Sequence, residues 1–203
     1  PTEGPARLAR LREVMAAAGV DGFLVPRGDA HQGETVPARD ERLAWLTGFT
    51  GSAGLCAALT ARAALFVDGR YTLQARSQIA SGAFEVVDIG ETTPEAWLAE
   101  AMPEGAVLGL DPMLLTAAQA APKAGGTVKW LDRNLVDQAW EGQPPPPLGR
   151  VEPHPEALAG ESAAARRSRI AAAIVRDGAD AAVLTLPDSI AWLLNIRGGD
   201  VAR

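Results

Sequence analysis

The side chains that could do chemistry are few in this chain, and they are not spaced for catalysis. The only histidines are His31 and His154, and neither has a partner at the metal-binding spacing His-x-x-x-His or His-x-x-Glu-His. Ser52 lacks the Gly-x-Ser-x-Gly turn of a hydrolase nucleophile. Cys56 lies in an apolar segment, where a free thiol normally packs as a small apolar group. The sequence therefore predicts no catalytic or metal centre of its own.

Six polar residues remain candidates for a binding surface. They are Asp29, His31, Glu34, Arg42, Asp68 and Arg70. The first three share a polar loop, where they could line a cleft, contact a partner subunit, or only form hydrogen bonds within the loop. The last three flank apolar segments, where they could form ion pairs that fix loops or reach a ligand or a partner.

The glycine-rich segment 48–54, Gly-Phe-Thr-Gly-Ser-Ala-Gly, is not expected to bind phosphate. A phosphate-binding loop follows a strand and begins a helix, so that the helix N-terminus faces the anion. Here the glycines follow a predicted helix and precede a predicted strand. The order is reversed, and we interpret the segment as a turn.

Apolar spacing along the chain predicts an α/β fold with a mixed sheet flanked by helices. We expect helices over 6–18, 39–46, 72–79, 116–123 and from Pro94, and strands over 23–25, 55–59, 64–67, 84–89, 107–110 and 127–131. Gly19 suits the left-handed position that ends a helix. Thr93 and Pro94 are typical of a helix start.

The chain contains part of itself twice. Residues 7–25 match residues 166–184 at an offset of 159, which pairs Gly19 with Gly178. Leu43-Ala44-Trp45-Leu46 recurs as Ile190-Ala191-Trp192-Leu193 at an offset of 147. The first copy continues for about a hundred residues after Trp45, whereas the second stops at Arg203. We therefore expect one complete domain and the truncated start of a second, related α/β domain. Residues 160–203 should form a helix, a strand and a helix that repeat residues 6–48.

Four prolines at 144–147 mark the predicted boundary, because such a run forms a stiff, extended spacer. We assign residues 1–142 to the first domain, 143–160 to a proline-rich linker and 161–203 to the truncated second domain. A proline-rich recognition motif is the alternative interpretation of the run.

The composition argues against nucleic-acid, secreted and membrane-bound classes of protein. The net charge is −6 and no stretch concentrates Lys and Arg, which argues against a nucleic-acid partner. A single cysteine excludes an internal disulfide and suits a reducing cytosol. No signal peptide or membrane-spanning run is visible, so we expect a cytoplasmic protein without a membrane partner.

Several segments, in order along nearly the whole chain, resemble the Xaa-Pro aminopeptidase (aminopeptidase P) family within the wider creatinase/prolidase group. They are Asp29-Ala30-His31-Gln32-Gly33-Glu34, residues 42–54, Asp68-Gly69-Arg70-Tyr71 with Gln74-Ala75, Asn134-Leu135-Val136-Asp137 with Trp140, and residues 190–201. Two positions depart from the family pattern: Gly33 stands where Ser is common, and Thr35 where Tyr is common.

The resemblance implies a creatinase-type N-terminal α/β domain, a second related domain, and a catalytic domain that this chain lacks. The catalytic domain would hold two divalent metals, manganese or zinc, and would hydrolyse the bond between an N-terminal residue and a following proline. The resemblance also implies a homodimer through the first domain, which overhangs the cleft that admits peptides. The six candidate residues would then line the substrate cleft or the subunit interface.

Two hypotheses follow. The first is that the chain is the inactive N-terminal portion of a metal-dependent Xaa-Pro aminopeptidase and contains no cofactor of its own. The second is a stand-alone, non-catalytic protein-binding module with a creatinase-type N-terminal fold. A reading frame that continues into a metal-binding domain would favour the first, and a gene that ends at Arg203 would favour the second.

Overall fold

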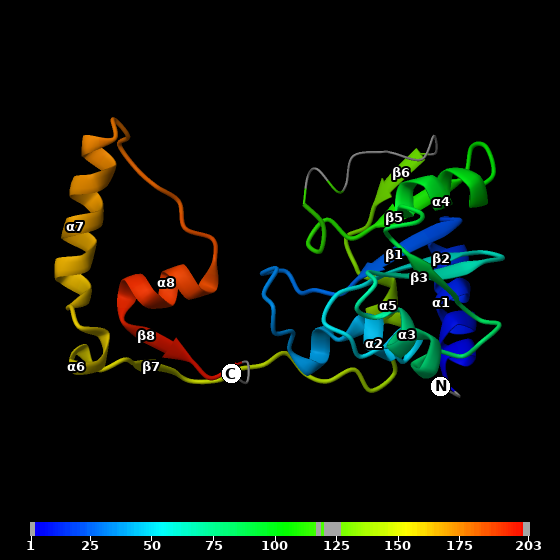
Figure 1. Cartoon of the computed structure of the whole chain (residues 1–203), viewed down its shortest axis with the longest axis horizontal. Coiled ribbons are helices and arrows are strands. Elements are labelled where there is room, and N and C mark those ends of the chain that lie inside the picture. The colour runs from blue at the N-terminus through cyan, green and yellow to red at the C-terminus, as the bar shows by residue number, and fades with distance from the viewer. Residues whose placement is uncertain (1–2, 117–118, 120–126, 201–203) are drawn as a thin grey trace. The chain divides into compact units, whose positions relative to one another are not determined.

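The chain divides into two compact units, residues 1–145 (unit 1) and 146–203 (unit 2) (Figure 1). The computed structural model describes residues 3–116, 119 and 127–200. The division falls within the proline run, and each unit is described by itself below.

Unit 1 is built on a six-stranded mixed sheet with the order β4-β3-β2-β1-β5-β6. The strands are β1 (Gly22–Pro26), β2 (Leu55–Leu59), β3 (Ala63–Val67), β4 (Glu85–Asp88), β5 (Val107–Leu110) and β6 (Thr127–Trp130). β2 pairs antiparallel with β1 and with β3, whereas β3–β4, β1–β5 and β5–β6 are parallel. The predicted mixed α/β architecture is confirmed.

Helices cover both faces of this sheet. They are α1 (Gly4–Ala18), the 3-10 turn η1 (Ala38–Asp40), α2 (Arg42–Thr47), α3 (Thr72–Gln78), α4 (Pro94–Ala101) and α5 (Leu135–Ala139). Helices α1, α2, α3 and α5 gather on one side of the sheet and α4 lies on the other (Figure 1). The helix expected over 39–46 is divided into η1 and α2, and α5 is not predicted by the apolar spacing. The helix expected over 116–123 extends outside the described residues.

Strand β1 is buried on both faces and separates two apolar clusters. Phe23 and Val25 point into the cluster beneath α1, α2 and α5, and Leu24 points into the cluster beneath α4. This alternation is the two-residue period of a strand. It explains why β1 is a continuous apolar run rather than an alternating one.

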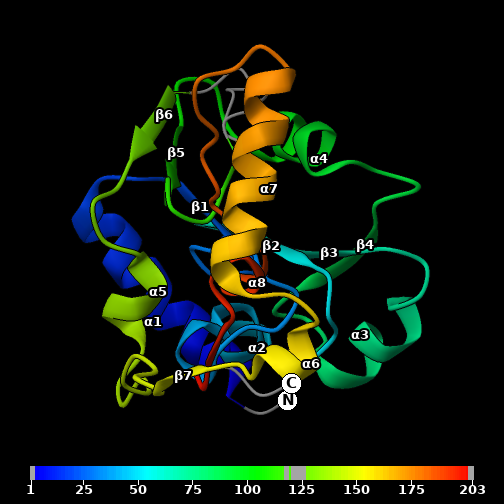
Figure 2. The same cartoon turned by 90° about the vertical axis from the view of Figure 1, so that its left-hand side faces the viewer.

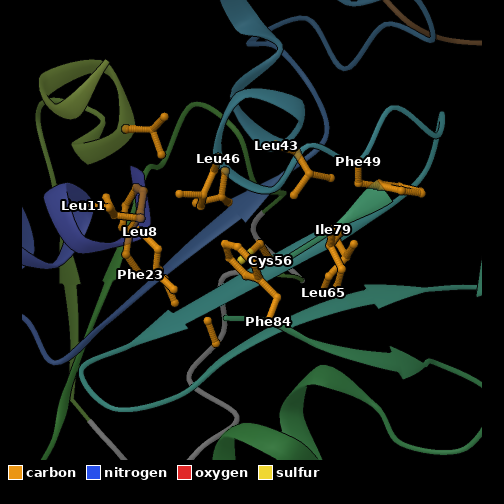
Figure 3. Packing of buried hydrophobic residues seen from close by; sticks show 14 of the residues in the cluster. Leu8, Leu11, Phe23, Leu43, Leu46, Phe49, Cys56, Leu65, Ile79 and Phe84 are labelled. Atoms are coloured by element: carbon orange, nitrogen blue, oxygen red, sulfur yellow. The ribbon is translucent and has the colours of Figure 1, made fainter. Parts of the chain in front are cut away.

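The larger cluster is closed by side chains that reach it from α1, α2 and the central strands (Figure 3). Figure 3 shows Leu8 and Leu11 of α1 and Leu43 and Leu46 of α2 converging above the strands that carry Phe23 and Cys56. Cys56 is fully buried, and burial raises the pKa of its thiol to about 12. The thiol therefore packs as an apolar group and stays protonated at neutral pH.

Unit 2 consists of β7 (Val151–Pro153), α6 (Glu156–Ala159), α7 (Ala163–Arg176), α8 (Pro187–Leu194) and β8 (Ile196–Gly198). β7 and β8 pair antiparallel. Residues 151–160, which the sequence places in a linker, thus contribute one strand and one helix to this unit. Figure 2 shows α7 and the extended chain that returns from its far end to α8.

One expectation for unit 2 is wrong in part. The repeat predicts a strand after α7, equivalent to β1, but residues 179–186 form no strand in the structure. In unit 1, β1 is hydrogen-bonded to β2 on one side and to β5 on the other. No strand in the described part of unit 2 takes either place, so the segment has no ladder to join. Both helix ends of the repeat are nevertheless preserved.

Those helix ends have left-handed conformations at matching positions. Gly19 and Gly178, at the offset of 159, have φ of 66° and 78°. Gly48 after α2 and Asn195 after α8, at the offset of 147, have φ of 83° and 52°. Both offsets read from the sequence are therefore reproduced in the backbone.

Two glycines of segment 48–54, Gly51 and Gly54, fold tightly around one aromatic ring. A Cβ atom at position 51 would lie 2.2 Å from Cζ of Phe49, and one at position 54 would lie 3.2 Å from the same ring. The Phe49 ring is buried and meets Tyr71 edge-on, with the ring centres 5.7 Å apart. The glycines are needed for packing, which accounts for them without a phosphate.

We expect Gly51→Ala to lower the free energy of unfolding by about 1–3 kcal/mol, because the added methyl group forces the buried Phe49 ring out of place. Chemical denaturation followed by circular dichroism measures the change. Gly28→Ala is the matched control, since an added Cβ there meets nothing within 4 Å. Equal stability of the two variants would show that Gly51 is not required for packing.

Candidate functional site

Asp29 shapes the loop that carries His31 and Glu34. Its side chain is 5% exposed, and Oδ1 accepts hydrogen bonds from the backbone N–H groups of His31 at 2.9 Å and Gly33 at 3.3 Å. The next turn places Gln32 in the left-handed region, with φ of 56°. The Asp29 carboxylate is thus committed to its own loop, whereas His31 and Glu34 are exposed.

Arg42 is the centre of a buried ion-pair cluster. Its Nε and Nη2 donate to the two carboxylate oxygens of Asp137 at 2.6 and 2.9 Å, and its Nη1 lies 2.8 Å from Oδ1 of Asp40. Burial acts to lower the pKa of Arg42, but the bonds and charges of the two aspartates outweigh it and the pKa is raised. The cluster clamps η1, α2 and α5 together.

Two further side chains extend this cluster toward the proline run. Gln143 Nε2 donates to Asp137 Oδ1 at 2.7 Å and to the Arg39 carbonyl at 3.0 Å. Arg39 Nη1 donates to the carbonyl of Pro144 at 3.2 Å. The end of unit 1 is therefore fixed by side-chain bonds to the 3-10 turn η1 and to α5.

Asp68 and Arg70 form an exposed ion pair at the turn between β3 and α3. Arg70 Nε and Nη2 donate to the Asp68 carboxylate at 3.0 and 2.7 Å, and the Arg70 guanidinium lies over the Tyr71 ring, 5.2 Å from its centre. Hydrogen bonding from Arg70 lowers the pKa of Asp68. Arg70 keeps most of its side chain in solvent, with 72% exposed.

The glycine-rich segment is bonded to the residues just beyond this turn. The hydroxyls of Ser52 and Tyr71 are 2.6 Å apart. Gln78 accepts from the Thr50 backbone N–H at 3.0 Å and donates to the Thr50 hydroxyl at 2.9 Å. The Ser52 hydroxyl thus serves a structural hydrogen bond, in agreement with the absence of a nucleophile motif around it.

The six candidate residues fall into three groups rather than one site. Among the residues described, no candidate is hydrogen-bonded or ion-paired to a candidate of another group. Arg27 bridges the first two groups indirectly, because it donates to the Glu34 carbonyl at 2.8 Å and lies 3.8 Å from the carboxylate of Glu41, the neighbour of Arg42. Within the described part of the chain, no group of three or more His, Cys, Asp or Glu side chains is placed to hold a metal ion. The groups that reach solvent, His31, Glu34 and Arg70, can contact a ligand or a partner but are not arranged for catalysis.

A separate recess of about 290 Å³ lies on the α4 side of the sheet. It is lined mainly by apolar residues, among them Leu24, Leu98, Leu108 and Val128. None of the six candidate residues lines it. Across the part of the chain that the structure describes, no helix is long and apolar enough to cross a membrane.

The partner of Arg42 in α5, Asp137, lies in a motif that the sequence shows, but the sequence does not show that the two residues pair. In Asn134-Leu135-Val136-Asp137 with Trp140, Asn134 caps α5 by accepting from the N–H of Val136 at 2.9 Å, and Leu135 and Val136 enter the core. Trp140 stacks on Trp45 with ring centres 5.2 Å apart. Asp137 is 95 residues from Arg42, so only tertiary structure could pair them.

The mixed sheet and most of its two apolar clusters lie within the segment that matches a creatinase/prolidase N-terminal domain. The family model with that description matches residues 7–133, and a second model of the same description matches residues 142–203. The chain belongs to the creatinase/prolidase N-terminal domain family. The second matched segment includes the proline run and all of unit 2.

Curated relatives are similar to the chain along nearly its whole length. A probable Xaa-Pro aminopeptidase P of Ajellomyces dermatitidis is 36% identical over 99% of this chain and 34% of the relative. Another from Coccidioides posadasii is 37% identical over 99% of this chain and 32% of the relative. The chain thus spans about a third of the length of the curated relatives it matches.

Solved structures agree with these matches. An X-prolyl aminopeptidase from Caenorhabditis elegans, described as a cytosolic enzyme with a di-nuclear active site, superposes with a TM-score of 0.87 at 30% identity. The match covers 97% of this chain and 35% of that one. The N-terminal domain of the cytoplasmic peptidase PepQ from Mycobacterium tuberculosis, with a TM-score of 0.51 at 22% identity, shares the fold over 66% of this chain.

We expect Arg42→Ala to lower the free energy of unfolding by about 2–4 kcal/mol, because it leaves two largely buried carboxylates without their cation. Denaturant unfolding measures the loss. Arg70→Ala is the matched control: it removes an exposed ion pair, and the unfolding midpoint should stay unchanged. An equal effect of both substitutions would contradict the distinction between buried and exposed pairs.

Proposed function

We propose that this chain is the N-terminal, non-catalytic portion of a metal-dependent aminopeptidase that removes the N-terminal residue from peptides with proline in second position. The observation that carries the proposal is the identity of 36–37% to Xaa-Pro aminopeptidase P relatives over 99% of the chain. Because the chain spans about a third of those relatives, the chemistry is assigned to the remainder of the protein.

The side chains that could act as metal ligands support the assignment of catalysis to the remainder of the protein. A dinuclear centre needs several converging carboxylates and imidazoles, and the described residues supply no such group. Asp29, Asp68 and Asp137 are each engaged in local hydrogen bonds or ion pairs. The two divalent metals, manganese or zinc, would therefore be bound outside the described residues, where they would activate water for attack on the peptide carbonyl.

Within the complete protein we assign unit 1 to dimerisation and to shaping access for the peptide substrate. His31, Glu34 and Arg70 are the candidates for contact with substrate or partner, because they reach solvent from loops that Asp29 and Asp68 hold in place. A cytoplasmic location is proposed by analogy with the C. elegans enzyme described as cytosolic.

The purified 203-residue chain is expected to release no N-terminal residue from an Xaa-Pro peptide, with or without manganese. The protein extended through its own reading frame should release it, and a chelator should abolish the release. Liberated amino acid is measured by chromatography. Activity of the 203-residue chain would overturn the proposal, and a reading frame that ends at Arg203 would favour the stand-alone binding module.

A homodimer through unit 1 is expected in sedimentation velocity, both for the 203-residue chain and for a chain ending at Pro145, where the first compact unit ends. Charge reversal of an exposed candidate, Arg70→Glu, should weaken an interface that includes this turn. If the shorter chain is monomeric while the 203-residue chain associates, the exposed surface of unit 2 is responsible, and the interface does not belong to unit 1.

A further inference from the structure

The apolar recess of unit 1 lies where the connections of the sheet diverge. Strands β1 and β5 are parallel neighbours, with Gly22 opposite Leu108. After β1 the chain returns to the sheet as β2 on one side of this pair, and after β5 it returns as β6 on the other side. In open α/β sheets such a topological switch point is where ligands bind, in the crevice at the carboxyl ends of the strands.

The residues that line the recess come from that end of the strands. Pro26 and Leu110 end β1 and β5, and Leu55, which begins the antiparallel β2, is paired with Pro26. Leu98 of α4 and Met102, which ends that helix, cover these strands. The volume of about 290 Å³ lies near the lower limit of ligand pockets, which is about 300 Å³. The recess therefore suits a small ligand with an apolar body.

Arg27 is the one cation among the described residues that line the recess. It follows β1 directly, and its side chain is 14% exposed. Its Nη1 donates to the Glu34 carbonyl at 2.8 Å, and its Nη2 is 3.8 Å from the Glu41 carboxylate, too far for a hydrogen bond. No other acceptor among the residues described is bonded to this guanidinium. Because a guanidinium carries several N–H groups, Arg27 has donors left for an anion in the recess.

The rest of the lining limits the charge that such an anion can carry. Glu95 also lines the recess, from the first turn of α4, where the helix dipole favours a carboxylate. It would repel a second negative charge on the ligand. The leucine side chains, moreover, offer a phosphate no hydrogen bonds in return for its lost hydration. A compound with one carboxylate and an apolar chain satisfies both the cation and the apolar wall.

We propose that this recess binds a small apolar compound with one carboxylate. Its chain packs against Leu24, Leu98 and Leu108, and its carboxylate accepts charge-assisted hydrogen bonds from Arg27. The site is separate from the six candidate residues, because none of them lines the recess. The carboxylate can belong to an alkanoic acid or to an apolar amino acid, and the two differ by an ammonium group.

Three probes with the same chain length test the site by isothermal titration calorimetry on the 203-residue chain. Octanoate has the carboxylate, octanamide has the same chain without the charge, and 2-aminooctanoate adds an ammonium group. We expect saturable binding of at least one of the two carboxylates with a Kd below about 1 mM. Octanamide should bind at least about tenfold more weakly than that carboxylate. The carboxylate that binds more tightly identifies the source as an alkanoic acid or an amino acid.

Two substitutions locate the bound probe. Leu98→Trp fills the recess from α4, and Arg27→Gln removes the cation but keeps an amide donor for the Glu34 carbonyl. Each should weaken binding of the carboxylate at least about tenfold. Leu73→Trp is the control for the first, since Leu73 is 80% exposed on α3, on the other side of the sheet. Arg39→Gln is the control for the second, because Arg39 also donates to a backbone carbonyl but does not line the recess.

Leu115→Trp, at a less buried position of the same lining, replaces Leu98→Trp if circular dichroism shows the latter to be unfolded. Absence of saturable binding of both carboxylates up to about 10 mM overturns the proposal. So does equal binding of octanamide, which would show that the charge is not recognised. An unchanged Kd in either recess variant also overturns it, because the probe would then be bound elsewhere. None of these measurements uses peptidase activity, so the proposal can fail independently of the proposed function.

Discussion

The pairing of Arg7 with Trp45 is the contact on which the rest of unit 1 depends. Helix α2 has six residues, too few to be stable alone, and it follows a polar loop and a 3-10 turn. The Arg7 guanidinium donates to the Trp45 carbonyl in its last turn, where the helix dipole favours a cation, and covers the indole ring. With α2 fixed to α1, Arg42 is aimed at α5 and the chain after Thr47 enters the glycine-rich turn.

Several residues that carry the family resemblance hold this arrangement together. Asp137 neutralises Arg42, Trp140 stacks on Trp45, and Gly51 leaves room for the Phe49 ring. The resemblance to the family therefore reflects shared packing of the fold. It bears on chemistry only through the activity of the relatives. His31 and Arg70 are different, because the fold places both side chains in solvent, although Arg70 also pairs with Asp68.

The sequence could predict those elements whose signal is local. The spacing in α1, the glycine that ends it, the threonine cap of α4 and the apolar run of β1 each reside in a few neighbouring residues, and each is present in the structure. Helix α5 was not predicted because five residues carry almost no periodic signal. Its stability comes from contacts with α1 and α2. Arg42, Asp68 and Arg70 were identifiable as charged residues beside apolar segments, and Asp29, His31 and Glu34 as members of a polar loop. The burial of Arg42 depends on Asp137, 95 positions away.

Unit 2 separates the interactions that form locally from those that need distant chain. Arg166 and Trp192 are 26 residues apart, and the helices that carry them are paired. The strand between those helices is not formed, because its partners would come from more distant sequence. In unit 1 the corresponding strand is bordered by β5, where the Asp21 carboxylate accepts from Val107 across 86 residues. Closing such a long loop costs entropy before any contact repays it. Loop-closure entropy therefore accounts for the contrast within unit 2, where the local contact between Arg166 and Trp192 is present and the strand that needs distant partners is not.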